Sequence, residues 1–150
     1  TQRRSDETRH SPPSSMSTRY DPNPTDLGQI LQELAPELRA PDYVFCCLPE
    51  APYGAYAQCK PLASIAEDEG LTLVLERDQA DAEGLPYTGT FRCISLGAFS
   101  SLEAVGLTAA ISATLTRSGI SANLLAGFHH DHILIPAHQA DEALQLLLQL

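Results

Sequence analysis

The run His129-His130-Asp131-His132 is the densest group of chemically active side chains in this sequence. Alternate residues of a strand share a face, so His130 and His132 could reach one metal ion with Asp131 nearby. Imidazoles also titrate near neutral pH, which would make this segment sensitive to pH. No cysteine or further acidic ligand has a suitable spacing. We therefore rank a structural or hydrogen-bonding use first, ligand contact second and a metal site third.

The other reactive side chains give weaker signals. Cys46, Cys47, Cys59 and Cys93 contain no Cys-x-x-Cys spacing, and we expect reduced thiols, two or three of them buried as small hydrophobic residues. The acidic residues 67–69 predict a solvated turn. The sequence has no Gly-x-Ser-x-Gly, Walker or Gly-x-Gly-x-x-Gly motif. It therefore offers neither a hydrolase nucleophile elbow nor a common phosphate-binding loop.

Charge and hydropathy exclude further classes of protein. The net charge is −10 over 150 residues, which argues against a nucleic-acid binder and against attachment to anionic lipids. Residues 25–150 are the acidic part, with five Lys or Arg against sixteen Asp or Glu. Apolar runs are too short to cross a bilayer, and the beginning lacks the apolar stretch of a signal peptide. We expect a cytoplasmic protein without a membrane partner or a cofactor.

The pattern of apolar residues predicts the elements that must position these side chains. Residues 1–24 are rich in Ser, Pro and Arg and predict a disordered tail. The elements expected after it are a helix over 27–34, a strand over 43–48, a hairpin of strands 62–67 and 71–75, a helix over 77–83, a strand over 91–98, a helix from 101 to 117, a strand face over 120–128, a strand over 132–135 and a C-terminal helix.

Capping residues and prolines predict where these elements begin and end. Pro41 should bound the strand over 43–48, because proline cannot donate to a strand ladder. Ser100 and Glu103 fit a capping box at the start of the 101–117 helix. Gly119 should supply the left-handed residue that ends it, and Gly84 should do the same after the helix over 77–83. In the C-terminal helix the residues expected to face inward are Ala140, Leu144, Leu147 and Leu148.

An internal similarity at a spacing of 60 residues indicates two related halves. Residues 71–81 align with residues 131–141, and each stretch follows a hairpin and opens a helix. We divide the chain into halves at 25–90 and 91–150. The order of elements in the second half is that of a ferredoxin-like α+β sandwich, an antiparallel sheet with helices packed on one face.

Five strings of residues carry a resemblance to a known family, namely residues 100–110, 119–123, 130–132, 43–45 and 69–73. They resemble the small ACT-domain proteins that were formerly grouped as a domain of unknown function. This resemblance implies two tandem ACT-like halves of the order βαββαβ, distantly similar to arginine-sensing ACT repeats. ACT domains bind amino acids or other small metabolites, often at domain interfaces, and regulate another activity.

The resemblance implies an amino acid or a similar small metabolite as ligand. Its carboxylate would suit the free N–H groups at the helix start after Ser100, and its ammonium group would suit Glu103 or Asp131. Asn123 could donate and accept together. The alternative is that Ser100 and Glu103 only cap the helix and that Asn123 bonds to the backbone. The residues expected to bind the ligand are Phe99, Ser100, Ser101, Leu102, Glu103, Ile120, Asn123, His130 and Asp131.

Three functions therefore stand beside one another. The first is a non-catalytic regulatory sensor of the ACT type that binds an amino acid, forms a homodimer and acts on a partner protein. The second is a metal-dependent enzyme that uses His130 and His132 of the histidine run. The third is a structural partner protein without a ligand, whose tail over 1–24 makes the contact.

Overall fold

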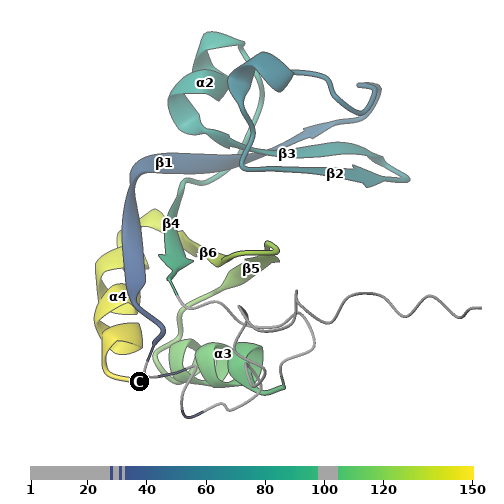
Figure 1. Cartoon of the computed structure of the whole chain (residues 1–150). Helices are drawn as coiled ribbons and strands as arrows, with labels where there is room; N and C mark the ends of the chain where they lie inside the picture. Colours follow the sequence, from purple (N-terminus) through teal and green to yellow (C-terminus); the bar gives the residue numbers. More distant parts are fainter. Residues whose placement is uncertain (1–27, 29–30, 32, 98–104) are drawn as a thin grey trace, which may run out of the picture.

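The computed structural model describes residues 28, 31, 33–97 and 105–150 of the chain (Figure 1). The predicted tail and half of the helix expected over 27–34 lie outside these residues. The described elements, in chain order, are β1 (Pro36–Leu48), the 3-10 helix η2 (Ala57–Cys59), β2 (Ala63–Glu67), β3 (Gly70–Glu76), α2 (Arg77–Ala82), β4 (Phe91–Leu96), α3 (Leu107–Arg117), β5 (Asn123–Ala126), β6 (Asp131–Pro136), the 3-10 helix η3 (Ala137–Gln139) and α4 (Ala140–Leu148).

The six described strands form one antiparallel sheet in the order β2-β3-β1-β4-β6-β5. β1 pairs with β3 from Tyr43 to Leu48, and nearer its beginning it pairs with β4. β1 therefore serves both halves of the chain. Its first residues supply the fourth strand beside β4, β6 and β5, which completes the strand set of a βαββαβ unit.

The expectation that Pro41 bounds this strand is wrong. β1 runs through Pro41, because its register against β4 shifts between Leu38 and Asp42. An irregular stretch of this kind needs no ladder N–H from its central residue, so a proline is tolerated there. The shift also separates the part of β1 that pairs with β4 from the part that pairs with β3.

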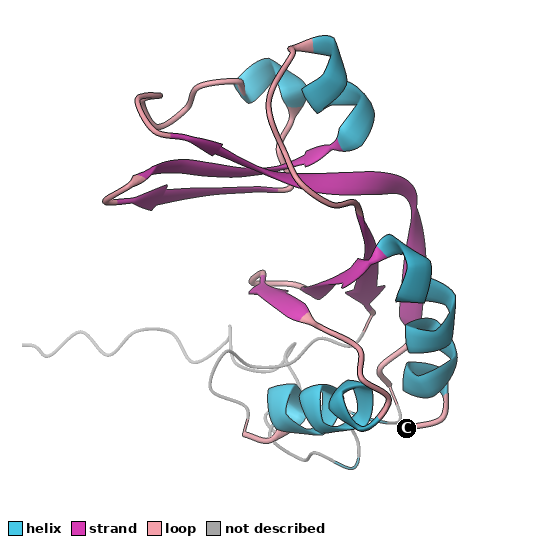
Figure 2. Ribbon diagram, turned by 180° about the vertical axis from the view of Figure 1, so that it is seen from behind, coloured by secondary structure: helices cyan, strands magenta, loops and turns pink. Residues whose placement is uncertain are grey.

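β1 bends sharply, and the sheet bends with it (Figures 1 and 2). We call β2, β3 and the end of β1 the first limb, and β4, β5, β6 and the beginning of β1 the second limb. α2 lies on the outer side of the first limb, and α4 lies on the outer side of the second (Figure 1). The expected antiparallel α+β arrangement with helices on one sheet face is confirmed.

Alternation along the strands divides the buried residues between two faces of the sheet. Val44 and Leu73 face α2 in the core of the first limb. Ile94 and Ile133 face α3 and α4 in the core of the second limb. A third core lies on the inner face, between the limbs, and its buried members are Tyr43, Val74, Cys93 and Leu134.

Both predicted glycine helix ends are confirmed. After α2 the N–H of Leu85 donates to Ala80, and after α3 the N–H of Ile120 donates to Leu115. Gly84 and Gly119 have φ of 65° and 68°, so each helix ends in a Schellman motif. In α4 the expectation for Leu148 is wrong. That side chain is 54% exposed, whereas Ala143 is buried.

Candidate functional site

Two histidines of the β5–β6 hairpin hold the last two residues of β4. The Oγ atom of Ser95 lies 2.7 Å from Nδ1 of His132, directly opposite it in the sheet. Nδ1 of His130 donates to the carbonyl oxygen of Leu96 at 3.0 Å. We call these four residues, together with Asp131 of the same hairpin, the candidate site.

The turn between β5 and β6 fixes the backbone at His130. The N–H of Gly127 donates to the carbonyl oxygen of His130 at 3.0 Å. A Cβ atom on Gly127 would lie 2.7 Å from that same oxygen, so only glycine fits this close approach. At the exposed tip the rings of Phe128 and His129 pack edge to face, with their centroids 5.1 Å apart.

Partial burial decides the electrostatics of the candidate site. Burial lowers the pKa of His132, Arg39 and His130 lower it further, and Asp131 opposes them. Burial also raises the pKa of Asp131, and His132 opposes that shift. The neutral imidazole of His132 is therefore favoured, and the carboxylate of Asp131 would gain from an ammonium partner.

Five of the expected site residues, Phe99, Ser100, Ser101, Leu102 and Glu103, lie outside the described residues. Leu96 stands three positions before Phe99 in the sequence, so the candidate site adjoins the beginning of the expected ligand-binding segment. That these five residues contact a ligand stays a prediction.

The expectation that a helix runs from residue 101 to 117 is wrong at its beginning. α3 begins at Leu107, and Gly106 stands before it with φ of 98°. Glycine adopts this left-handed conformation without steric cost. A residue inside an α-helix has a negative φ, so Gly106 is not part of the helix. The N–H groups of the first turn of α3 therefore follow Gly106 instead of Ser100.

The structure separates two other expected site residues, Ile120 and Asn123, from the candidate site. Ile120 is 4% exposed and belongs to the core between α3, α4 and the sheet, so its side chain has little surface for a ligand. Asn123 pairs with Leu134 at the beginning of β5, whereas Ala126, at the other end of β5, pairs with Asp131. The amide of Asn123 donates to the carbonyl of Leu134 at 3.2 Å. His130 and Asp131 are thus brought together without Ile120 or Asn123.

Both histidines considered for a metal have one ring nitrogen in a protein contact, since Nδ1 of His132 lies on Ser95 and Nδ1 of His130 on Leu96. Over residues 33–97 and 105–150, no three His, Cys, Asp or Glu side chains gather as a metal ion requires. In the described part of the chain, no helix is long and apolar enough to cross a membrane.

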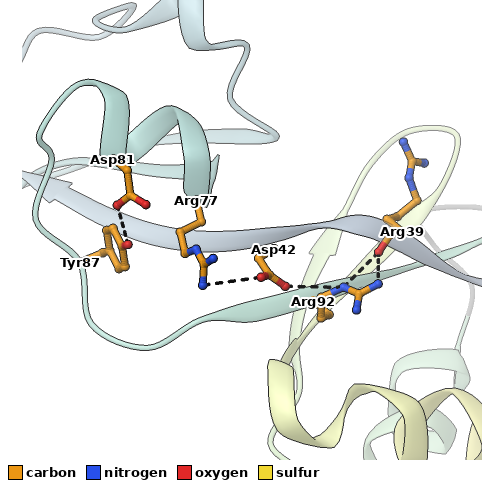
Figure 3. A network of polar contacts seen from close by, with 6 residues as sticks. All are labelled: Arg39, Asp42, Arg77, Asp81, Tyr87 and Arg92. Atoms are coloured by element: carbon orange, nitrogen blue, oxygen red, sulfur yellow. Dashed lines mark hydrogen bonds and ion pairs between the residues drawn. The ribbon is translucent and has the colours of Figure 1, made fainter.

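A second polar network stabilises the bend of β1 (Figure 3). The Nε and Nη2 atoms of Arg92 donate to the carbonyl of Arg39 at 3.2 and 2.6 Å. The carboxylate of Asp42 lies between two arginines. Its Oδ1 atom is 3.9 Å from Nε of Arg92, and its Oδ2 atom is 3.7 Å from Nη1 of Arg77 in α2. A cavity of about 400 Å³ beside this network is lined by Ala40, Pro41, Asp42, Glu76, Arg77 and Asp78.

The first half has a shallow groove at the place that corresponds to the candidate site, where its hairpin meets the end of its first strand. A Cβ atom on Gly70 would lie 2.7 Å from the carbonyl of Leu48, which shows how closely the two segments approach. The groove measures about 230 Å³ and is lined by Pro49, Glu50, Ala51, Tyr53, Ala66, Glu67, Asp68, Gly70 and Leu71.

Sequence reasoning missed Ser95 and Arg92. Ser95 is 8% exposed and is one of two buried polar residues in the described part of the chain. A single serine inside an apolar strand that faces a histidine-bearing strand is a signal that could have found it. Arg92 stands in the same strand, and nothing local in the sequence indicates its bond to Arg39.

Two family models, both described as the ACT domain, match this chain in tandem. The first matches residues 23–92 and the second matches residues 88–149. A search of curated proteins finds no match.

Solved structures match with the same fold. A protein of unknown function from Vibrio cholerae, titled a possible transport protein, is 46% identical with a TM-score of 0.73 over 80% of this chain and 91% of its own. A protein from Agrobacterium tumefaciens is 17% identical with a TM-score of 0.64, over 76% and 86%.

The ligand-free regulatory subunit of aspartate kinase from Thermus thermophilus is 13% identical with a TM-score of 0.60, over 78% of this chain and 97% of its own. At such identities the two more distant structures show the fold alone. The two tandem family matches and the shared sheet lead to one conclusion: this chain belongs to the ACT-domain family and carries two ACT domains in tandem.

Proposed function

We propose that this protein is a non-catalytic regulatory sensor that binds an amino acid or a similar small zwitterion. The tandem ACT architecture carries the proposal, because ACT domains are ligand-binding regulatory domains. A similar fold in the regulatory subunit of a Thermus aspartate kinase supports it. So does an Escherichia coli aspartokinase structure in complex with aspartate and ADP, 12% identical with a TM-score of 0.59.

The binding site that we propose extends from the candidate site into residues 99–103. Asp131 would receive the ammonium group of the ligand, because its carboxylate is disfavoured by burial and gains from a cation. Glu103 would share the ammonium group with Asp131, as the sequence predicts. His130 would define one wall through its contact with Leu96.

The first test is a thermal-shift screen of the twenty amino acids against the full chain. A ligand at a hundred times its Kd adds about 2.7 kcal/mol to the free energy of unfolding, which raises Tm clearly. We expect one or a few amino acids to raise Tm, and we expect Asp131→Asn to weaken that rise. Asp141→Asn, on the exposed side of α4, is the matched control.

The same screen is repeated with EDTA and with zinc, because the enzyme alternative depends on a bound metal. If no amino acid raised Tm, the sensor proposal would be overturned. A fall in Tm on EDTA would then favour the histidine metal site.

Our proposal includes a homodimer that acts on a partner protein in the cytoplasm. β2 and β5 are the outermost strands among those described, and Ile65 of β2 is 41% exposed. Outer strands are the places where a sheet can add a second copy. All four cysteines are free thiols, which favours a reducing compartment. Sedimentation equilibrium should give twice the chain mass.

A further inference from the structure

Besides the strand pairing of β4 with β6, two side-chain hydrogen bonds join the β5–β6 hairpin to the end of β4, and both come from histidines two positions apart. His132 contacts the hydroxyl of Ser95, and His130 contacts the carbonyl of Leu96, the next residue of β4. The hairpin therefore contacts the side chain of Ser95 and the main chain of the next residue, Leu96. Few other side chains can do this and also change charge near neutral pH.

The partner of each histidine shows whether its Nδ1 atom must carry a proton. A carbonyl oxygen only accepts, so Nδ1 of His130 must carry a proton. The hydroxyl of Ser95 can donate to a neutral His132 or accept from a protonated one. The contact between Ser95 and His132 therefore tolerates either form, and the cost of protonating His132 comes from its surroundings.

The surroundings of His132 oppose a positive charge. Burial is the largest cause that lowers its pKa, and the cations Arg39 and His130 add to it. Asp131 opposes this shift. The groups that face or adjoin His132 in the sheet are Ser95 and Cys93 from β4, Arg39 and Glu37 from β1, Leu125 from β5, and His130 and Asp131 from its own hairpin.

We propose that His130 and His132 are positioning residues that fasten the end of β4 to the β5–β6 hairpin, and that acidification loosens this attachment and weakens ligand binding at the candidate site. The loss of binding rests on the proposed function, whereas the attachment does not. A protonated His132 would keep a half-buried cation beside Arg39, and opening the hairpin would return that charge to water.

The direction of the pH effect follows from the sign of the shift. The folded state binds a proton at His132 less readily than the unfolded state does. Stability is therefore unaffected by this group above its ordinary pKa near 6.5 and falls as the pH drops through that value. Asp131 acts oppositely, because its raised pKa means that protonation at lower pH relieves a penalty.

Amide hydrogen exchange on the full chain tests the attachment without any ligand. Protection factors of the β5–β6 amides are compared at about pH 7.5 and about pH 5.5, on either side of the ordinary imidazole pKa. We expect wild-type protection to fall several-fold at the lower pH. In His132→Asn the fall should disappear, because an asparagine amide can still reach Ser95 and does not titrate. His138→Asn, in η3, should behave as the wild type.

Two outcomes would overturn the attachment: wild-type protection that does not depend on pH, or a His132→Asn variant that loses protection on acidification as the wild type does. Imidazole NMR spectra of the wild type decide the same point if the variant does not fold. A ring of His132 that titrates as a free imidazole overturns it.

The ligand readout separates this inference from the proposed function. With an amino acid from the thermal-shift screen, affinity should fall more steeply on acidification in the wild type than in His132→Asn, where only the protonation of Asp131 remains. Equal loss in both proteins overturns the link to binding. If no amino acid binds at either pH, the proposed function and that link fail together, while the exchange data still decide the attachment.

Discussion

The four cysteines differ in what surrounds their thiols. Burial raises the pKa of Cys46, Cys59 and Cys93, whereas Cys47 is exposed on β1. Because the thiolate is the reactive form, we expect iodoacetamide at neutral pH to label Cys47 first and the others only on unfolding. Mass spectrometry of the native chain checks this, with Cys47→Ser as control. Rapid labelling of a second cysteine would contradict the burial of that thiol.

Gly70 is the residue that closes the β2–β3 hairpin over the end of β1. Its φ is 142°, and a Cβ atom there would lie 2.6 Å from the Cα of Pro49. We expect Gly70→Ala to cost about 2–4 kcal/mol of unfolding free energy, since strain adds to a backbone collision. Gly84→Ala, with φ of 65° and open space, should cost only about 1–2 kcal/mol. Urea unfolding measures both, and equal losses would contradict the collision.

Among the elements, β1 depends on Arg92 for its bend. Arg92→Lys removes a planar donor pair from the carbonyl of Arg39, and lysine cannot reproduce that geometry. We expect a loss of about 1–2 kcal/mol. Arg77→Lys changes only a partly exposed ion pair with Asp42 at 3.7 Å, and should cost less than about 0.5 kcal/mol. Denaturant titration compares the two, and a larger loss for Arg77→Lys would argue against this role of Arg92.

Elements that depend on near neighbours could be predicted, and those that depend on distant ones could not. The helix ends at Gly84 and Gly119 follow from local capping chemistry, and both were found. The beginning of α3 at Leu107 and the path of β1 through Pro41 were not. A register shift against β4 decides the latter, and β4 begins fifty residues further along the chain.

For the candidate site, the sequence drew attention to His130, Asp131 and His132 but not to the partners of the two histidines in β4, Ser95 and Leu96. Ser95 and His132 are 37 positions apart in the chain. The residues around Ser95 do not indicate that its partner is His132. The division of the chain at residue 90 and the role of residues 99–103 stay predictions.

The whole molecule should unfold as one cooperative unit, because β1 belongs to both limbs and a core lies between them. Leu134 is fully buried in that inner core. We expect Leu134→Ala to cost about 2–5 kcal/mol and to lower protection in both limbs together. Leu148→Ala, at a side chain 54% exposed, should cost less than about 1 kcal/mol. Circular dichroism and amide exchange follow the transition, and two separate transitions would contradict a shared core.

The sequence by itself determined the repeat, the α+β class, the hairpins and the ends of two helices. These depend on alternation, helical spacing and capping, which act over a few residues. Only the tertiary structure decided that β1 joins two limbs, that Ile120 is a core residue and that His132 meets Ser95. Each of these requires segments far apart in the chain to pack together. Which segments meet depends on the burial of both sheet faces at once.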